Sequence, residues 1–158
     1  MPQGPRASAS PLQSLLHLLH RAAQRADAVF ASHVGVALTP RQYTILQAVA
    51  EADGLSQTDI MAATGIDRSS IAELTKRLVA HGWVRRRRTR KDARAYAVRL
   101  TPEGRRMLEV GAPAARAVEE ALLASLSKAQ RQVLLSALAA LAREEKSTRL
   151  AAVKREQP

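Results

Sequence analysis

The segment that most constrains the fold is Trp83 to Leu100, WVRRRRTRKDARAYAVRL, which holds eight basic residues and one acid. Apolar residues still alternate at both of its ends. Val84 precedes the basic run, and the residues that follow it at every second position are Tyr96, Val98 and Leu100. This alternation on both sides of a charged turn predicts two β-strands joined by that turn. Basic side chains carried on such a hairpin favour a polyanionic partner, with nucleic acid, and DNA in particular, as the first hypothesis.

Composition narrows the class of partner. The chain has 158 residues, enough for one domain with a real core, and its formal net charge is +11. Such a charge favours a phosphate-bearing partner, with a membrane surface as the rival. No apolar run approaches the roughly 20 residues that a spanning helix needs, and the N-terminus lacks the pattern of a signal peptide. We therefore expect a cytoplasmic protein without a membrane partner.

Several chemical classes are excluded by what the sequence lacks. Without cysteine there are no disulfides, thiol redox sensors or thiolate metal sites. Aromatic residues make up only 3% of the chain, which argues against an aromatic stacking platform for single strands. No glycine-rich phosphate loop, HExxH sequence or nucleophile elbow is present. We therefore expect neither an enzyme nor a bound cofactor or metal.

Spacing and capping residues predict the helices before the hairpin. Residues 1–10 are rich in Pro, Gly, Ser and Ala and are expected to be disordered. Leucine and alanine at helical spacing predict a long first helix over 11–33. Thr39-Pro40-Arg41-Gln42 predicts the start of a second helix, with Thr as N-cap, Pro in the first position and Gln three residues after the cap. Gly54 follows the end of that helix.

Two short helices are expected directly before the hairpin. Ser56 is the N-cap of the first, which Gly65 stops, and Asp67 is the N-cap of the second. The second covers 68–81 and is closed by Gly82. A tight turn between two short helices is a helix-turn-helix, and the hairpin that follows makes it a winged helix-turn-helix.

The chain after the hairpin is expected to be helical. Thr101-Pro102 opens a long fifth helix, which Gly111 and Pro113 are expected to bend near its middle. A capping box of Ser127 to Gln130 starts a sixth helix. Residues from about Lys146 are charged and are expected to fray.

Residues 68–81 divide into two sides when placed on a helix. Ile71, Leu74, Thr75 and Leu78 cluster on one side, which leaves the polar side free to enter a major groove. Side chains near the N-terminus can hold a phosphate, and Lys or Arg can pair with phosphates or guanine edges. An ordinary amphipathic helix is the alternative for this segment taken alone. The candidate DNA contacts of the helix-turn-helix are Thr58, Arg68, Ser69, Ser70, Glu73, Lys76 and Arg77.

Glu73 is the one acid on this polar side, and two roles stay open for it. Its carboxylate can accept a hydrogen bond from cytosine N4, or it can pair with Arg77 four residues on. In the hairpin, Asp92 can likewise hold Arg94 in a fixed direction or only cap the turn. Arginines 85–88 alternate faces in a strand, so we expect two of them to contact phosphates. The candidate contacts of the hairpin are Arg86, Arg88, Arg90, Lys91 and Arg94.

Three runs taken in order closely resemble the MarR family of bacterial transcription regulators. They are LTPRQYTILQAVAE, GLSQTDIMAATGIDRSSIAELTKRLVAHGWVRRR and RKDARAYAVRLTPEGRRML, and they cover about residues 38 to 108. The resemblance implies a mainly α homodimer in which a winged helix-turn-helix with a two-stranded wing lies between long N- and C-terminal dimerisation helices. The implied regions are a disordered tail (1–10), a dimerisation helix (11–37), the DNA-binding region (38–104), C-terminal dimerisation helices (105–146) and a charged tail (147–158).

The dimer interface implied by the resemblance agrees with the leucine pattern. Long helices with leucine-rich faces need a surface to bury against, and one small winged domain offers little. A two-fold dimer would bind a pseudo-palindrome with half-sites about one helical turn apart. The residues assigned to this interface are Leu12, Leu15, Leu16, Leu19, Leu134, Leu138 and Leu141.

The resemblance also implies repression that a small ligand relieves, often a phenol or an aromatic carboxylate. The sequence says less here, because polar residues of this kind are more often solvated or structural. The candidate ligand-binding residues are His17, His20, Arg21, His33, Arg41 and Tyr43. A DNA-binding protein with an architectural role, little sequence preference and no inducer is the alternative function.

Overall fold

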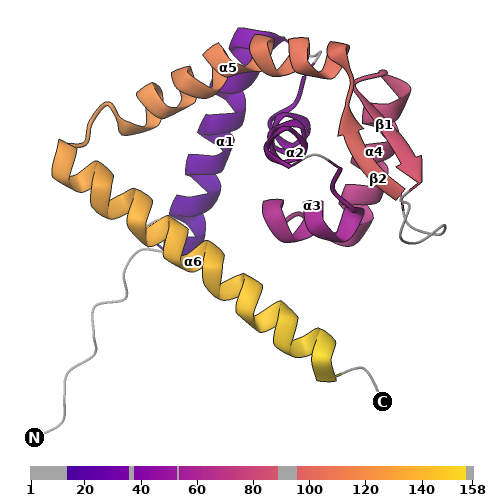
Figure 1. Ribbon diagram of the computed structural model, residues 1–158. Helices are drawn as coiled ribbons and strands as arrows, with labels where there is room; N and C mark the ends of the chain where they lie inside the picture. Colours follow the sequence, from indigo (N-terminus) through magenta and orange to yellow (C-terminus); the bar gives the residue numbers. More distant parts are fainter. Residues whose placement is uncertain (1–13, 36–37, 53, 89–95, 156–158) are drawn as a thin grey trace, which may run out of the picture.

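The computed structural model describes residues 14–35, 38–52, 54–88 and 96–155, with side chains described up to residue 142. Within these residues the chain forms six helices and one two-stranded antiparallel sheet, which confirms the predicted mainly α fold with a β wing (Figure 1). The elements in order are α1 (Leu15–Val34), α2 (Pro40–Glu51), α3 (Gln57–Thr64), α4 (Arg68–Ala80), β1 (Val84–Arg88), β2 (Tyr96–Leu100), α5 (Pro102–Leu123) and α6 (Lys128–Arg155).

The elements fall into two groups. Figure 1 shows α2, α3, α4 and the hairpin gathered on one side, with α5 leading from the hairpin to α1 and α6 extending away as a long separate helix. Helix α5 packs along α1 and also touches α2 and β2, so it joins the two groups. No helix among the described residues is long and apolar enough to cross a membrane.

The predicted N-caps of α2 and α3 are confirmed as capping boxes. In α2, Thr39 Oγ1 accepts from the N–H of Gln42 at 3.3 Å, and Gln42 Oε1 accepts from the N–H of Thr39 at 2.9 Å. In α3, Asp59 takes the place of the usual Glu or Gln, yet its Oδ2 still reaches the N–H of Ser56 at 3.0 Å. Each box satisfies two backbone donors that the helix itself cannot.

Some predicted boundaries were wrong. Helix α1 begins at Leu15 with Ser14 as its N-cap, not at residue 11, because the Ser14 hydroxyl accepts from the N–H of His17 at 3.3 Å. Helix α6 continues to Arg155 through the segment 147–155 expected to be a frayed tail, since good helix formers such as Ala, Leu, Lys and Arg fill it. The predicted division after residue 104 falls inside α5, and α4 ends at Ala80.

The core lies where α2, α3 and α4 meet the hairpin. The side chains of Ile45, Leu46, Ile60 and Leu78 have no exposed surface. The segment after α2 also joins β2, because the carbonyl of Leu55 accepts from the N–H of Val98 at 2.7 Å. Strand β2 is therefore bonded to β1 and also to the segment after α2. The buried residues of the hairpin extend the core of the three helices.

The apolar residues of β2 differ in burial. Val98 and Leu100 are buried, and Ala97 is buried as well. Tyr96, on the same face as Val98 and Leu100, is 46% exposed because this end of the strand extends beyond the core. Its ring centroid lies 6.0 Å from the guanidinium carbon of Arg88, within reach of a cation–π contact.

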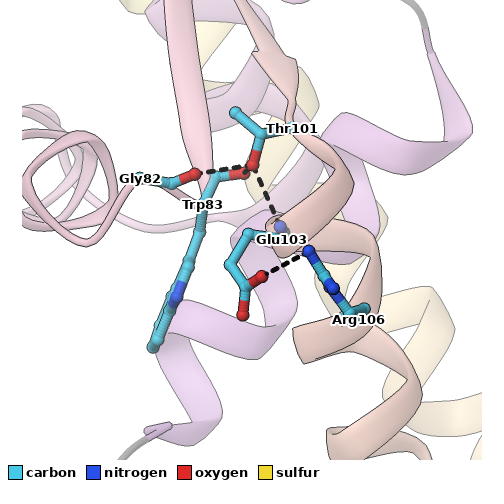
Figure 2. Close-up of polar contacts among 6 residues, drawn as sticks. Gly82, Trp83, Thr101, Glu103 and Arg106 are labelled. Atoms are coloured by element: carbon cyan, nitrogen blue, oxygen red, sulfur yellow. Dashed lines mark hydrogen bonds and ion pairs between the residues drawn. The ribbon is translucent and has the colours of Figure 1, made fainter.

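Thr101 joins the base of the hairpin to α5. Its hydroxyl lies 2.6 Å from the carbonyl oxygen of Gly82 and 3.1 Å from that of Trp83, and it accepts from the N–H of Gly104 at 3.1 Å (Figure 2). The backbone N–H of Thr101 also donates to the Trp83 carbonyl at 3.1 Å. One residue thus caps α5 and holds the chain that leaves α4 against the chain that enters α5.

Two glycines allow α5 to approach its neighbours closely. A Cβ on Gly104 would lie 2.0 Å from the carbonyl oxygen of Trp83, and a Cβ on Gly111 would lie 2.5 Å from the ring of Tyr43. The Tyr43 ring in turn packs against Phe30 of α1 with centroids 5.5 Å apart. Helix α5 remains one uninterrupted helix through both Gly111 and Pro113.

Gly104→Ala is predicted to destabilise the fold despite the higher helix propensity of alanine. The added methyl meets backbone, which cannot rotate away, so we expect a loss of about 3 kcal/mol in the free energy of unfolding. Urea denaturation followed by circular dichroism measures it. Arg105→Ala, an exposed neighbour in the same helical turn, is the control and should change stability by less than about 0.5 kcal/mol. Equal stability of the two variants would contradict the close approach.

Candidate nucleic-acid interface

Helix α4 presents the two sides that the sequence predicted. Ile71, Thr75 and Leu78 are buried, and Leu74 is half-buried beside them. The exposed residues on the opposite side are Ser69, Glu73, Lys76 and Arg77. Thr58 in the first turn of α3 and Arg68 at the start of α4 are also exposed, and Ser70 is half-buried. Every predicted contact of the helix-turn-helix therefore has surface available to a partner.

The N-terminus of α4 is less open to phosphate than predicted. Asp67 Oδ1 accepts from the backbone N–H of Ser70 at 2.9 Å and from the hydroxyl of Ser69 at 2.5 Å. The hydrogen bonds from Ser69 and Ser70 hold the pKa of the Asp67 carboxyl far below its ordinary value of 3.8. Two of the donors near this N-terminus, the Ser69 hydroxyl and the Ser70 backbone N–H, are thus engaged by an internal carboxylate.

Glu73 forms the ion pair with Arg77 that was one of the two roles left open for it. Glu73 Oε1 lies 3.0 Å from Arg77 Nε, and both side chains are more than half exposed. The pair borders a shallow depression between α4 and the first turn of α2. The lining residues are Arg41, Ser69, Ser70, Glu73, Leu74 and Arg77.

Arg41 lies in a place that sequence reasoning missed. It was assigned to a ligand pocket with Tyr43, yet it lines the depression beside Glu73 and Arg77, while Tyr43 is buried against α5. Arg41 and Tyr43 are two positions apart on α2, so they point to different sides of the helix. Only the packing of α2 beside α4 reveals that Arg41 belongs with α4, and no local sequence signal carries that information.

The hairpin carries arginines on both of its faces. Val84 of β1 is buried, while the four arginines that follow it are all exposed. The register pairs Arg86 with Val98 and Arg88 with Tyr96, so these two predicted contacts share the face of Val84. Arg85 and Arg87 are on the opposite face. The predicted turn residues Arg90, Lys91, Asp92 and Arg94 lie outside the described residues.

The predicted ligand-binding residues do not form one cluster. His17 is half-buried on α1, whereas His20, Arg21 and His33 are exposed. The Nδ1 atom of His33 lies 2.8 Å from the carbonyl oxygen of Val29, one turn earlier in its own helix. Among the residues described, no group of three or more His, Cys, Asp and Glu side chains is placed to hold a metal.

A second shallow groove lies between α2 and α5. Its walls combine apolar side chains with two carboxylates, those of Glu51 and Glu109, and with the amide of Gln47. Tyr43 is the only residue of this groove that the sequence put forward. The lining residues are Tyr43, Gln47, Ala50, Glu51, Leu108, Glu109 and Ala112.

The leucines assigned to a dimer interface are exposed in the single chain. Leu16 is 80% exposed, and the others lie between 38% and 69%. Leu12 lies outside the described residues. The described members are Leu15, Leu16 and Leu19 on α1 and Leu134, Leu138 and Leu141 on α6.

A family model described as MarR family matches residues 38–95, which run from the start of α2 into the turn of the hairpin. Among curated proteins, the HTH-type transcriptional repressor NicR of Pseudomonas putida is 32% identical over 116 residues, which are 73% of this chain and 73% of NicR. The transcriptional regulator HosA of Escherichia coli is 32% identical over 94 residues, 60% of this chain and 70% of HosA. These relatives are regulators of transcription, not enzymes.

Solved structures are similar over most of the chain. BpsR of Bordetella bronchiseptica, described with regulation of its DNA binding by 6-hydroxynicotinic acid, is 29% identical with a TM-score of 0.79, and the match covers 87% of this chain and 97% of BpsR. The transcriptional repressor CouR, bound to a 23-mer DNA duplex, is 32% identical with a TM-score of 0.73, and the match covers 82% of this chain and 93% of CouR.

The stabilisation of α4 by its N-cap Asp67 is predicted to depend on pH. Because folding lowers the pKa of Asp67, its stabilising effect is full above its ordinary pKa of 3.8 and is lost as the pH falls below that value. The melting temperature of the wild-type chain should therefore exceed that of Asp67→Ala at neutral pH, and the gap should close in acid. Asp27→Ala, which removes an exposed acid that caps no helix, is the control. A gap that persists unchanged in strong acid would contradict the role of the ionised cap.

Proposed function

This chain belongs to the MarR family of transcriptional regulators, and on that basis we propose that it is a homodimeric repressor which binds a pseudo-palindromic operator and which a small aromatic acid releases. The observation that carries the proposal is the exposed polar side of α4 next to a hairpin whose first strand bears four exposed arginines. The DNA major groove is wide enough to admit a helix such as α4, and the hairpin beside α4 supplies positive charge.

Two kinds of contact are proposed for the DNA. Lys76 and the arginines of β1 neutralise phosphates, which supplies affinity that does not depend on sequence. Arg77, which Glu73 pairs with, and the half-buried Ser70 offer hydrogen-bonding groups to base edges. The similarity to CouR, whose solved structure contains a DNA duplex, supports DNA as the partner.

Dimer formation is proposed from the leucine faces of α1 and α6. Six described leucines are 38% to 80% exposed, a large apolar surface for a soluble chain. They lie on the two long helices away from α4 and the hairpin (Figure 1), so a partner chain there would leave the DNA-binding surface free. A two-fold dimer would place two α4 helices in successive major grooves.

An aromatic acid is proposed as the effector because DNA binding by BpsR is described as regulated by 6-hydroxynicotinic acid. The groove between α2 and α5 offers Tyr43, Leu108 and an amide, but its two carboxylates disfavour an anion. The cationic candidates His20 and Arg21 on α1 would supply the charge that a carboxylate needs. The effector site is therefore proposed along α1, between the leucine face and the DNA-binding group.

Binding to a selected operator and to random DNA at the same salt concentration tests the DNA-binding proposal. A site enriched from a randomised duplex library should bind at least about a thousandfold more tightly than random DNA. Affinity for both should fall steeply with salt, because phosphate contacts release counterions. A ratio near one would contradict sequence-specific repression and favour an architectural DNA-binding protein.

A thermal-shift screen tests the effector. An aromatic acid that binds the folded chain raises its melting temperature by mass action, and the same acid should lower the affinity for the selected operator. 6-Hydroxynicotinic acid is the first probe, with a saturated ring carboxylate of similar size as the control. If no aromatic acid shifts the melting temperature or releases the DNA, the ligand-release part of the proposal is wrong.

A further inference from the structure

A contribution to stability does not explain the Glu73–Arg77 ion pair. The two residues are one helical turn apart on the exposed side of α4, and Arg77 Nε lies 3.0 Å from Glu73 Oε1. The side chain of Arg77 is 62% exposed and that of Glu73 is 54% exposed. Solvent-exposed pairs at this spacing contribute only about 0.3 to 0.5 kcal/mol to stability. A carboxylate on a surface that meets phosphates also repels them. Its presence on the polar side of α4 therefore calls for a role in recognition.

The geometry of the pair leaves the other end of the guanidinium free. Glu73 accepts from Nε of Arg77, which occupies one of the five N–H donors. The two terminal nitrogens carry the remaining four donors and have no hydrogen-bond partner among the described residues. Two parallel donors of this kind match O6 and N7 on the major-groove edge of guanine.

The depression beside the pair holds a second cation. Ser69, Ser70 and Leu74 of α4 line it together with the pair and with Arg41 of α2. The positive charge of Arg41 disfavours a turn of Arg77 toward α2, since like charges repel. The hydroxyl of Ser69 donates to Asp67, so it does not compete for Glu73.

We propose that Glu73 is a positioning residue, which holds Arg77 so that its terminal nitrogens select a guanine at one position of each half-site. The inference rests on the proposed function, because it requires a sequence-specific complex with DNA. Glu73 acts through Arg77 and need not touch the DNA. Without Glu73, Arg77 remains a cation that can contact a phosphate, so binding persists while the preference for guanine is lost.

The test begins with the full-length wild-type chain and a randomised duplex library. The enriched site is then compared with single-base variants of itself, for the wild-type chain and for Glu73→Ala, Glu73→Gln and Arg77→Lys. Glu103→Ala is the matched control, because it removes an exposed ion pair with Arg106, 2.8 Å long, that lies on α5 and not on α4 (Figure 2). Melting temperatures establish that each variant is folded.

The expected result is a loss confined to one base pair in each half-site. Glu73→Ala and Arg77→Lys should lower the preference for guanine there about tenfold, the scale of one bidentate contact. Glu73→Ala should bind random DNA as tightly as the wild-type chain or more so, because a negative charge is removed. Glu73→Gln keeps an acceptor oxygen and should retain most of the preference, and Glu103→Ala should match the wild-type chain.

Three results would overturn the inference. If Glu73→Ala keeps the wild-type preference at every position, Glu73 does not orient Arg77. If Glu73→Ala weakens binding equally to all sequences, its role is in the stability of α4. If the wild-type chain enriches no sequence at all, the proposed sequence-specific function fails and the inference fails with it. The first two results leave the proposed function intact.

Discussion

The contact between Thr101 and the end of α4 is the one on which the arrangement of the molecule depends. The Thr101 hydroxyl lies between the carbonyl oxygens of Gly82 and Trp83 and also caps α5 through the N–H of Gly104. The hairpin begins and ends at this point, so its base is held to α4 and α5 together. Gly104 makes the approach possible, because any side chain there would meet the Trp83 carbonyl.

The contact at Thr101 connects two groups of elements whose exposed surfaces differ in chemistry. On one side of it, α4 and the hairpin present exposed arginines and polar side chains. On the other side, α1 and α6 present exposed leucines. Helix α5 runs between them, and its Gly111 lies against Tyr43 of α2, whose ring packs on Phe30 of α1. The position of the wing relative to the leucine faces is thus determined by α5 and its first turn.

Local signals in the sequence predicted most of the helices and the two sides of α4. Thr39, Ser56, Asp67 and Thr101 act as N-caps where predicted, because a cap is formed by residues only three positions apart. The two sides of α4 followed from helical periodicity alone. The start of α1 does not follow from periodicity, because the leucine spacing continues back to Leu12, past the N-cap Ser14. The continuation of α6 does not follow from charge, because Lys and Arg are good helix formers.

What the sequence left open depends on contacts between distant segments. Arg41 and Glu73 are 32 positions apart, and only the packing of α2 beside α4 brings them to one depression. The ion pair between Glu73 and Arg77 likewise depends on side-chain positions that the sequence does not give. The engagement of the α4 N-terminus by Asp67 was predicted as a cap, but its consequence for phosphate binding became clear only from the hydrogen bonds of Ser69 and Ser70.

The central claim is that two copies of the chain read two half-sites with α4 and the wing. A hydroxyl-radical footprint of the chain on its selected operator tests this most directly. The account predicts two protected regions related by two-fold symmetry, with centres about one helical turn, or roughly 10 base pairs, apart and on one face of the duplex. Uniform protection along the whole duplex, or a single protected region without a symmetry mate, would contradict it.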